Sequence, residues 1–153
     1  ESIIYLSQKD KNFSSILEMY KKLYNSPIMI QKFIPEVKEG DKRIIIIDGE
    51  PIGCVNRIPS KSEIRANMHV GAKAVKSSLS KNEKKICSII APELIKRELL
   101  LVGIDIIGER YLTEINVTSP TGLQEINFFD KISSEKYIWD IIEAKYAKRL
   151  NFS

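Results

Sequence analysis

Asp105, Glu114 and Asn116 are the residues whose types and spacing could do chemistry. Carboxylate and amide oxygens are the ligands that Mg2+ prefers in proteins. The three residues lie in two runs rich in β-branched side chains, 102–107 and 112–117, and a short polar segment with one glycine joins the runs. This pattern predicts a β-hairpin that could present all three oxygens together.

The register of this hairpin decides whether the three side chains converge. If Glu109 and Arg110 form a two-residue loop, Asp105 lies directly opposite Glu114, with Asn116 diagonal to both on the same face. Opposed like charges destabilise a strand pair unless a cation compensates them, which favours a metal site. The alternative is an ordinary solvated face, and a slip of one residue would separate the two acids. The other face is nearly all apolar and should pack into a core.

Two further strands are predicted just upstream. The run 44–47 consists of isoleucines alone and should be buried on both faces of a sheet. The turn signal 48–51 then predicts a hairpin with a returning strand over 52–58. Arg43 and Arg57 lie toward the open end of this hairpin, where guanidinium groups suit phosphate or carboxylate. Surface arginines at strand ends would be equally ordinary.

Hydrophobic periodicity and capping signals predict three helices. Apolar residues recur at helical spacing over 13–24 and 135–150. Ser80 with Glu83 forms a capping box that opens a third helix, over 80–98, which Pro92 should kink or split. Short strands are also expected over 1–6 and 28–33.

Composition limits the possible partners. The 153-residue chain has 43% hydrophobic and 29% charged residues, which suits one soluble globular domain with a core. Its net charge of +4 could indicate nucleic acid, but 20 acidic residues are interleaved with scattered lysines and no nucleic-acid-binding module appears. No apolar run approaches the roughly 18 residues of a membrane span.

The cysteines and the single histidine have no chemical assignment. Cys54 and Cys87 lack metal-ligand spacing and do not amount to a disulfide framework, so we expect both to be buried in a reducing cytoplasm. His69 lies in a polar stretch without a visible partner, and we interpret it as a solvated loop residue.

Longer motifs carry a family resemblance. The strings VGIDIIG and LTEINVTSPTG, together with EGDKRIIIIDGEP and RIP upstream, resemble bacterial glutathione synthetase, an ATP-grasp ligase, almost from end to end. The resemblance implies an α+β fold, with a mostly antiparallel sheet and helices packed on one face. It also implies a cytoplasmic enzyme that joins γ-glutamylcysteine and glycine through an acyl phosphate, with ATP as co-substrate and Mg2+, or Mn2+, as cofactor.

The resemblance also implies a role for each matched residue. Asp105, Glu114 and Asn116 hold the metal between the ATP phosphates. The nucleotide would meet Gln31, Lys32, Phe33, Ile34, Asp41 and Leu101. The catalytic residues would be Arg43, Arg57 and Arg65, the first two at the γ-phosphate or acyl phosphate. The peptide substrate would meet Arg57, Asn67, Ser119, Pro120 and Thr121.

The polar stretch 59–78 and the chain boundaries complete these expectations. A loop of about 20 residues is usually functional or disordered, and the resemblance makes this one a mobile cover over the substrate. Ala66 and Ala72 stand where the family has glycine, which implies a stiffer cover or one that closes through different backbone dihedrals. The family's lysine-bearing strand, Gly-rich loop and N-terminal substrate domain would lie upstream. We therefore expect a C-terminal piece of a homo-oligomeric enzyme, inactive alone.

Two other functions remain open from the residues. One is a different ATP-grasp carboxylate–amine ligase, for which the same hairpin would serve. The other is a non-catalytic nucleotide-binding fragment.

Overall fold

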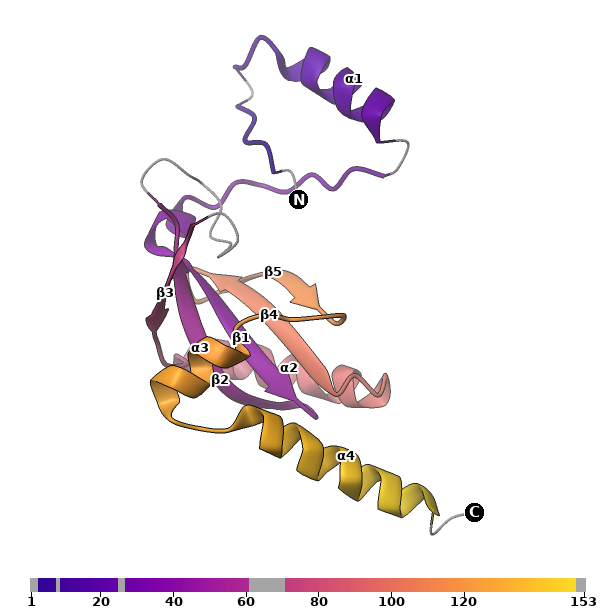
Figure 1. The fold of residues 1–153 in the computed structure, drawn as a ribbon. Helices are drawn as coiled ribbons and strands as arrows, with labels where there is room; N and C mark the ends of the chain where they lie inside the picture. Colours follow the sequence, from indigo (N-terminus) through magenta and orange to yellow (C-terminus); the bar gives the residue numbers. More distant parts are fainter. Residues whose placement is uncertain (1–2, 8, 25–26, 61–70, 151–153) are drawn as a thin grey trace. The chain divides into compact units, whose positions relative to one another are not determined.

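The computed structural model describes residues 3–7, 9–24, 27–60 and 71–150 (Figure 1). The chain divides into two compact units, Glu1–Pro35 and Glu36–Ser153. Within the described residues, no helix has the length and apolar character needed to cross a membrane.

The first unit has one helix and no strand among its described residues. Helix α1 spans Phe13–Leu23, close to the predicted 13–24, but it buries no residue. The predicted strands over 1–6 and 28–33 are wrong for the described residues, which lie in no helix or strand. An extended segment becomes a strand only when a neighbour pairs with its backbone, and the described part of this unit offers none.

The second unit contains one antiparallel sheet of five strands in the order β3-β2-β1-β4-β5. A 3-10 turn, η1 (Pro35–Glu39), precedes the first strand. The strands are β1 (Asp41–Ile47), β2 (Glu50–Ile58), β3 (Lys73–Lys76), β4 (Leu101–Ile107) and β5 (Tyr111–Asn116). Strand β3 falls inside the stretch 59–78 that we expected to be a loop, and it pairs with the end of β2.

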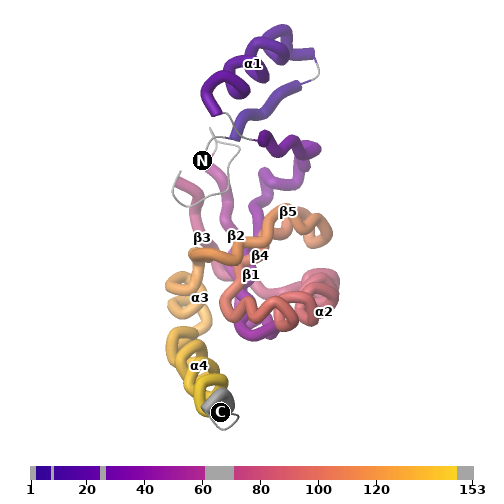
Figure 2. Tube along the Cα trace, turned by 90° about the vertical axis from the view of Figure 1, so that its right-hand side faces the viewer, coloured from indigo at the N-terminus to yellow at the C-terminus, as the bar shows by residue number. Residues whose placement is uncertain are grey.

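The helices of this unit lie on both faces of the sheet (Figure 2). Helix α2 (Lys81–Lys96) covers the face that carries Ile44, Ile46 and Ile104. Helices α3 (Leu123–Asp130) and α4 (Ser134–Leu150) lie on the other side, where Ile126 packs against Ile45. Residues 44–47 are at most 1% exposed, so this run is buried from both sides as predicted. The α+β class and the antiparallel sheet are confirmed, and the structure adds a helical layer on the second face.

The predicted features of α2 and the cysteines are largely confirmed. Ser80 accepts a hydrogen bond from the backbone N–H of Glu83, whose side chain accepts one from the N–H of Ser80, which is the full capping box. Pro92 lies inside α2 without splitting it. Cys54 of β2 and Cys87 of α2 are buried and unpaired in the core between this helix and the sheet. Burial raises the pKa of both thiols, that of Cys87 to about 11.

The apolar pattern predicts that Ile138, Trp139, Ile142 and Tyr146 of the C-terminal helix and Ile115 of the edge strand pack into the core. In α4, Ile138 and Ile141 pack toward the sheet, while Trp139 faces solvent. In β5, which is an edge strand of the sheet, Ile115 is exposed. Helix α3 was not predicted at all.

Candidate functional site

Two buried arginines converge on one buried carboxylate at the end of the sheet away from the β1–β2 turn. Arg43 and Asp105 are cross-strand neighbours on β1 and β4. Arg43 donates from Nε to Oδ1 of Asp105 at 2.5 Å and from Nη2 to Oδ2 at 2.9 Å. Arg57 of β2 reaches Oδ2 of the same carboxylate with Nη2 at 2.7 Å. Both arginines and Asp105 are 4% exposed.

Asp41 is the second carboxylate of this cluster. It pairs with Arg57 across the β1–β2 ladder, and its Oδ1 accepts hydrogen bonds from Nε at 2.6 Å and Nη2 at 2.5 Å. Burial raises the pKa of Asp41 to about 6, because the loss of solvent outweighs the attraction of Arg57. The two carboxylates outweigh burial at Arg57 and raise its pKa. Asp41, Arg43, Arg57 and Asp105 form what we call the charged cluster, in which two positive charges balance two negative ones.

The predicted pairing of Asp105 with Glu114 is present in the structure. The two residues are direct partners in the β4–β5 ladder, and Asn116 pairs with Gly103 two residues along. The turn is one residue longer than predicted, since Ile107 pairs with Tyr111. A β-bulge between Asp105 and Ile106 restores the predicted register beyond it.

Asn116 organises the loop that follows β5. Its Oδ1 accepts hydrogen bonds from the backbone N–H groups of Thr118 and Ser119 at 3.2 and 3.3 Å. Further along this loop, the carbonyl of Thr121 accepts a hydrogen bond from Nη1 of Arg43 at 3.1 Å. The predicted substrate-binding loop therefore lies directly beside the charged cluster.

A close approach of backbone and loop holds this arrangement. A Cβ added at Gly103 would come within 2.6 Å of the Cβ of Pro120 and 3.2 Å of the Cδ of Arg43. Glycine at position 103 thus gives the loop the space to reach Arg43.

The donor atoms suit a hard divalent cation to different degrees. A carboxylate offers about four lone-pair positions. At Asp105, three of them accept N–H groups of Arg43 and Arg57. One position remains for a metal, and the exposed Glu114 faces it across the ladder. Asn116 would have to exchange its two backbone hydrogen bonds. No trio of His, Cys, Asp or Glu clusters within the described residues, so water and phosphate would complete such a site.

The nucleotide residues predicted by resemblance are residues 31–34 in the first unit and Asp41 and Leu101 in the second, and Asp41 belongs to the charged cluster. Residues 31–34 lie in no helix or strand, and Phe33 is in edge contact with Tyr5. Leu101 packs in the core under α3 and α4 with Ile47, its partner on β1. Arg65, Asn67, Ala66 and His69 lie outside the described residues.

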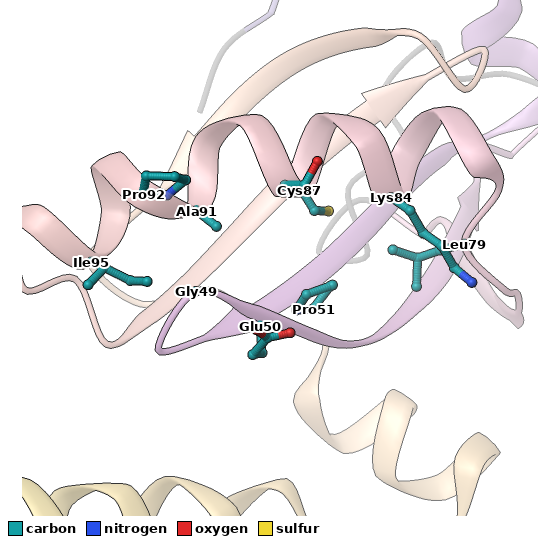
Figure 3. Close-up of a pocket in the computed structure, with 10 residues that line it drawn as sticks. Gly49, Glu50, Pro51, Leu79, Lys84, Cys87, Ala91, Pro92 and Ile95 are labelled. Carbon is teal, nitrogen blue, oxygen red and sulfur yellow. The ribbon is translucent and has the colours of Figure 1, made fainter.

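The cavity of about 500 Å3 on the α2 side contains none of the predicted site residues (Figure 3). It lies between the β1–β2 turn and α2, and Pro51, Cys87 and Pro92 are among its largely apolar lining. The charged cluster is on the opposite face, since Arg43 alternates with the buried Ile44 along β1.

Sequence reasoning missed the contact of Asp41 with Arg57. The two-residue turn at Asp48-Gly49, counted along a regular ladder, would place Asp41 opposite Asn56. A bulge between Ile45 and Ile46 moves the pairing by one residue and brings Arg57 there instead. The available signal was Pro51, since proline cannot donate to a regular ladder and is found at bulges.

Residues 1–131 match the family model described as the prokaryotic glutathione synthetase ATP-grasp domain. The chain belongs to this family, as the motifs indicated.

Curated relatives carry the same family name. The chain is 47% identical over 143 residues to the glutathione synthetase of Mesorhizobium japonicum, covering 94% of the chain and 45% of the relative. The corresponding protein of Brucella melitensis biotype 1 is 48% identical, with 94% and 46% covered. That of a Synechocystis strain is 50% identical over 127 residues, with 83% and 39% covered. The chain thus spans about half the length of the curated relatives it matches.

Proposed function

We propose that the complete natural protein containing this chain is a glutathione synthase. It would ligate γ-L-glutamyl-L-cysteine and glycine with ATP, giving glutathione, ADP and phosphate. The observation that carries the proposal is the pair of buried guanidinium groups of Arg43 and Arg57 at one carboxylate, opposite Glu114, in a chain of this family. Buried positive charge at a strand end is what a transferring phosphoryl group requires.

The reaction needs charge neutralisation and positioning more than side-chain proton transfer. A carboxylate oxygen of γ-glutamylcysteine forms a bond to the γ-phosphorus while the bond to the oxygen of ADP breaks. The glycine amine then attacks the acyl carbon, phosphate leaves, and the amine loses its proton to solvent. Arg43 and Arg57 would hold the phosphoryl oxygens through both steps, because a guanidinium fork matches phosphate.

The metal and the remaining substrate contacts belong to the same proposal. Asp105 and Glu114, with Asn116 after rearrangement, would hold Mg2+ or Mn2+, which supplies charge neutralisation at the phosphates. The loop Ser119, Pro120 and Thr121 would meet the peptide substrate. Residues 31–34 would meet the nucleotide, and Arg65 and Asn67, in the part of the predicted cover 59–78 that precedes β3, would meet the peptide.

The wider organisation is also proposed. The coverage of the relatives supports a second half that completes the nucleotide and substrate sites, so that this chain would be the C-terminal part of the ATP-grasp domain and inactive alone. The unpaired thiols of Cys54 and Cys87 and the use of ATP support a cytoplasmic location. A homo-oligomer is what the resemblance implies.

The test is a ligation assay on the complete protein. Glutathione and ADP should appear in equal amounts with γ-glutamylcysteine, glycine, ATP and Mg2+. Arg57→Met should lower kcat at least about a hundredfold, the scale for losing one electrostatic contact to a transition state. The matched control is Asp48→Asn, which removes an exposed ion pair with Lys145 at the other end of β1.

Two results would contradict the proposal. Faster turnover with another amine or another peptide acid would indicate a different ATP-grasp ligase. ATP binding without any phosphate release would indicate a nucleotide-binding protein that is not an enzyme.

A further inference from the structure

Thr113 is the residue that makes the bulge in the β4–β5 hairpin. Ile106 pairs with Leu112 and Asp105 pairs with Glu114, so β5 contributes one residue more than β4 at this point, namely Thr113. The hydroxyl of Thr113 donates a hydrogen bond to the backbone carbonyl of Asp105 at 3.1 Å. This bond ties the extra residue of β5 to the strand position of a candidate metal ligand.

The bulge is what brings Glu114 opposite Asp105. If the pairing near the turn continued without it, Thr113 would lie opposite Asp105, and Glu114 would lie opposite Ile104. A shift of one residue moves a strand's side chains to the other face of the sheet. Glu114 would then point to the side where Ile104 packs under α2, away from the carboxylate of Asp105. The two acidic residues share a face because the bulge adds one residue before Glu114.

Burial does little to hold β5 in this register. The strand lies at an edge of the sheet, and its apolar side chains Tyr111, Leu112 and Ile115 are all exposed. Register is weakly specified where neither face of a strand is buried. A local hydrogen bond at the bulge is therefore the kind of contact that can decide the alignment.

We propose that Thr113 is a positioning residue, which fixes the bulge and so holds Glu114 opposite Asp105 for a divalent cation. This inference rests on the proposed function, in which the two carboxylates bind Mg2+ or Mn2+. Arg43 and Arg57 hold the carboxylate of Asp105 from β1 and β2, whereas Thr113 holds its backbone from β5.

The side chain of threonine suits this task and allows a clean substitution. Its branched Cβ favours a strand, and its hydroxyl can donate to a backbone carbonyl. Valine has nearly the same shape without the donor, and serine keeps the donor without the methyl group. Thr113→Val and Thr113→Ser thus separate the hydrogen bond from the shape of the side chain.

The experiment measures binding of ATP to the complete protein by calorimetry, once with Mg2+ and once with EDTA in its place. Thr113→Val should weaken binding with Mg2+ about three- to tenfold, the scale of one neutral hydrogen bond. Binding without the metal should stay within about twofold, and Thr113→Ser should match wild type in both conditions. The matched control is Ser88→Ala, which removes another hydroxyl-to-carbonyl hydrogen bond, to Lys85 in α2, and should leave both affinities unchanged.

A deletion in the turn tests the bulge itself. Without Arg110, a turn of the same length can lead into a regular ladder that keeps Asp105 opposite Glu114 and needs no bulge. In this background, Thr113→Val should no longer weaken binding with Mg2+. Arg110→Ala is the control for loss of the exposed ion pair with Glu36, and in it Thr113→Val should still have its full effect.

Different results would overturn the inference or the proposed function. Equal weakening with and without Mg2+ would show that Thr113 does not act through the metal ligands. A lower unfolding temperature of Thr113→Val with unchanged binding would indicate a merely structural hydrogen bond, and an effect that persists without Arg110 would exclude the bulge as its route. Wild-type protein that binds ATP with Mg2+ but does not ligate would refute the proposed function alone. Wild-type binding that does not depend on Mg2+ would refute the inference.

Discussion

Gly103 and Gly53 are buried on the same face of the sheet, but different neighbours crowd them. A Cβ at Gly103 would meet Pro120 of the substrate loop, whereas one at Gly53 would meet Cγ2 of Ile126 in α3 at 2.5 Å. Gly103→Ala should therefore raise the KM for the peptide substrate by about tenfold or more, because the loop must leave Arg43.

The matched variant Gly53→Ala should act on stability alone, lowering the free energy of unfolding by about 1–3 kcal/mol through overpacking against α3. Steady-state kinetics and urea unfolding of both variants make the comparison. Equal loss of substrate affinity in the two variants would contradict a specific contact between Gly103 and the loop.

Asp41 also gives the stability a defined dependence on pH. Because its pKa rises from 3.8 to about 6 on folding, the folded state retains the proton more strongly. Its contribution to the free energy of unfolding is therefore most favourable below about pH 4 and declines as the pH rises to about 6. At pH 7, Asp41→Asn should be more stable than wild type by about 1–3 kcal/mol.

The measurement is urea unfolding of wild type, Asp41→Asn and Asp48→Asn between pH 4 and 7. Arg57, Arg43 and Asp105 face Asp41, and Arg57, whose pKa the two carboxylates raise, keeps its charge throughout this range. The difference between Asp41→Asn and wild type should grow with pH, and that for Asp48→Asn should not. A difference independent of pH would contradict the raised pKa.

At the scale of elements, Glu83 joins helix α2 to the sheet. Its side chain is 1% exposed, and its carboxylate forms an ion pair with Nζ of Lys42 at 2.8 Å. The same carboxylate accepts the hydrogen bond from the N–H of Ser80 that closes the capping box. Ser80→Ala should cost about 1 kcal/mol, the usual effect of losing a helix cap. Glu83→Ala should lower the free energy of unfolding by about 3 kcal/mol or more, because it also leaves the largely buried ammonium group of Lys42 without its carboxylate partner. Thermal and urea unfolding will rank the two variants, and equal losses would show that the ion pair contributes nothing.

Elements with strong local signals could be predicted from the sequence. Ser80 and Glu83 place the start of α2 because a cap needs only neighbouring residues. Asp48 and Gly49 both have positive φ, which their types favour, so the first turn was predictable. The facing of Asp105 and Glu114 was predicted as well, although the longer turn and the bulge cancel each other there.

Other elements depend on packing that local patterns do not contain. Helix α3 is only eight residues long, and it forms where Ile126 docks on the sheet. The periodicity of α4 did not distinguish Ile138, which packs inward, from Trp139, which is exposed. The charged cluster itself combines β1, β2 and β4, so the contact of Asp41 with Arg57 depended on a bulge that the turn alone does not reveal.

At the scale of the whole chain, the two units differ in their cores. Both buried apolar clusters belong to Glu36–Ser153, and no described residue of Glu1–Pro35 is buried. A chain of residues 36–153 should therefore have a free energy of unfolding within about 1 kcal/mol of the whole, as for changes away from any core. Urea unfolding of the two chains tests this. A larger loss, or a broader transition in the shorter chain, would show that the first unit supports the sheet.

The two β-bulges allow the length of each turn to vary without changing how the strands are aligned at the charged cluster. In each hairpin the irregularity lies between the turn and the charged residues, at Ile45/Ile46 and at Asp105/Ile106. A residue gained or lost in the turn can be absorbed at the bulge before it reaches Arg57 or Glu114. The exposed turn between β4 and β5 is thus a natural place to graft a peptide tag or a fluorescent reporter. The same property should let the turn length change in a variant of this chain while Asp105 stays opposite Glu114.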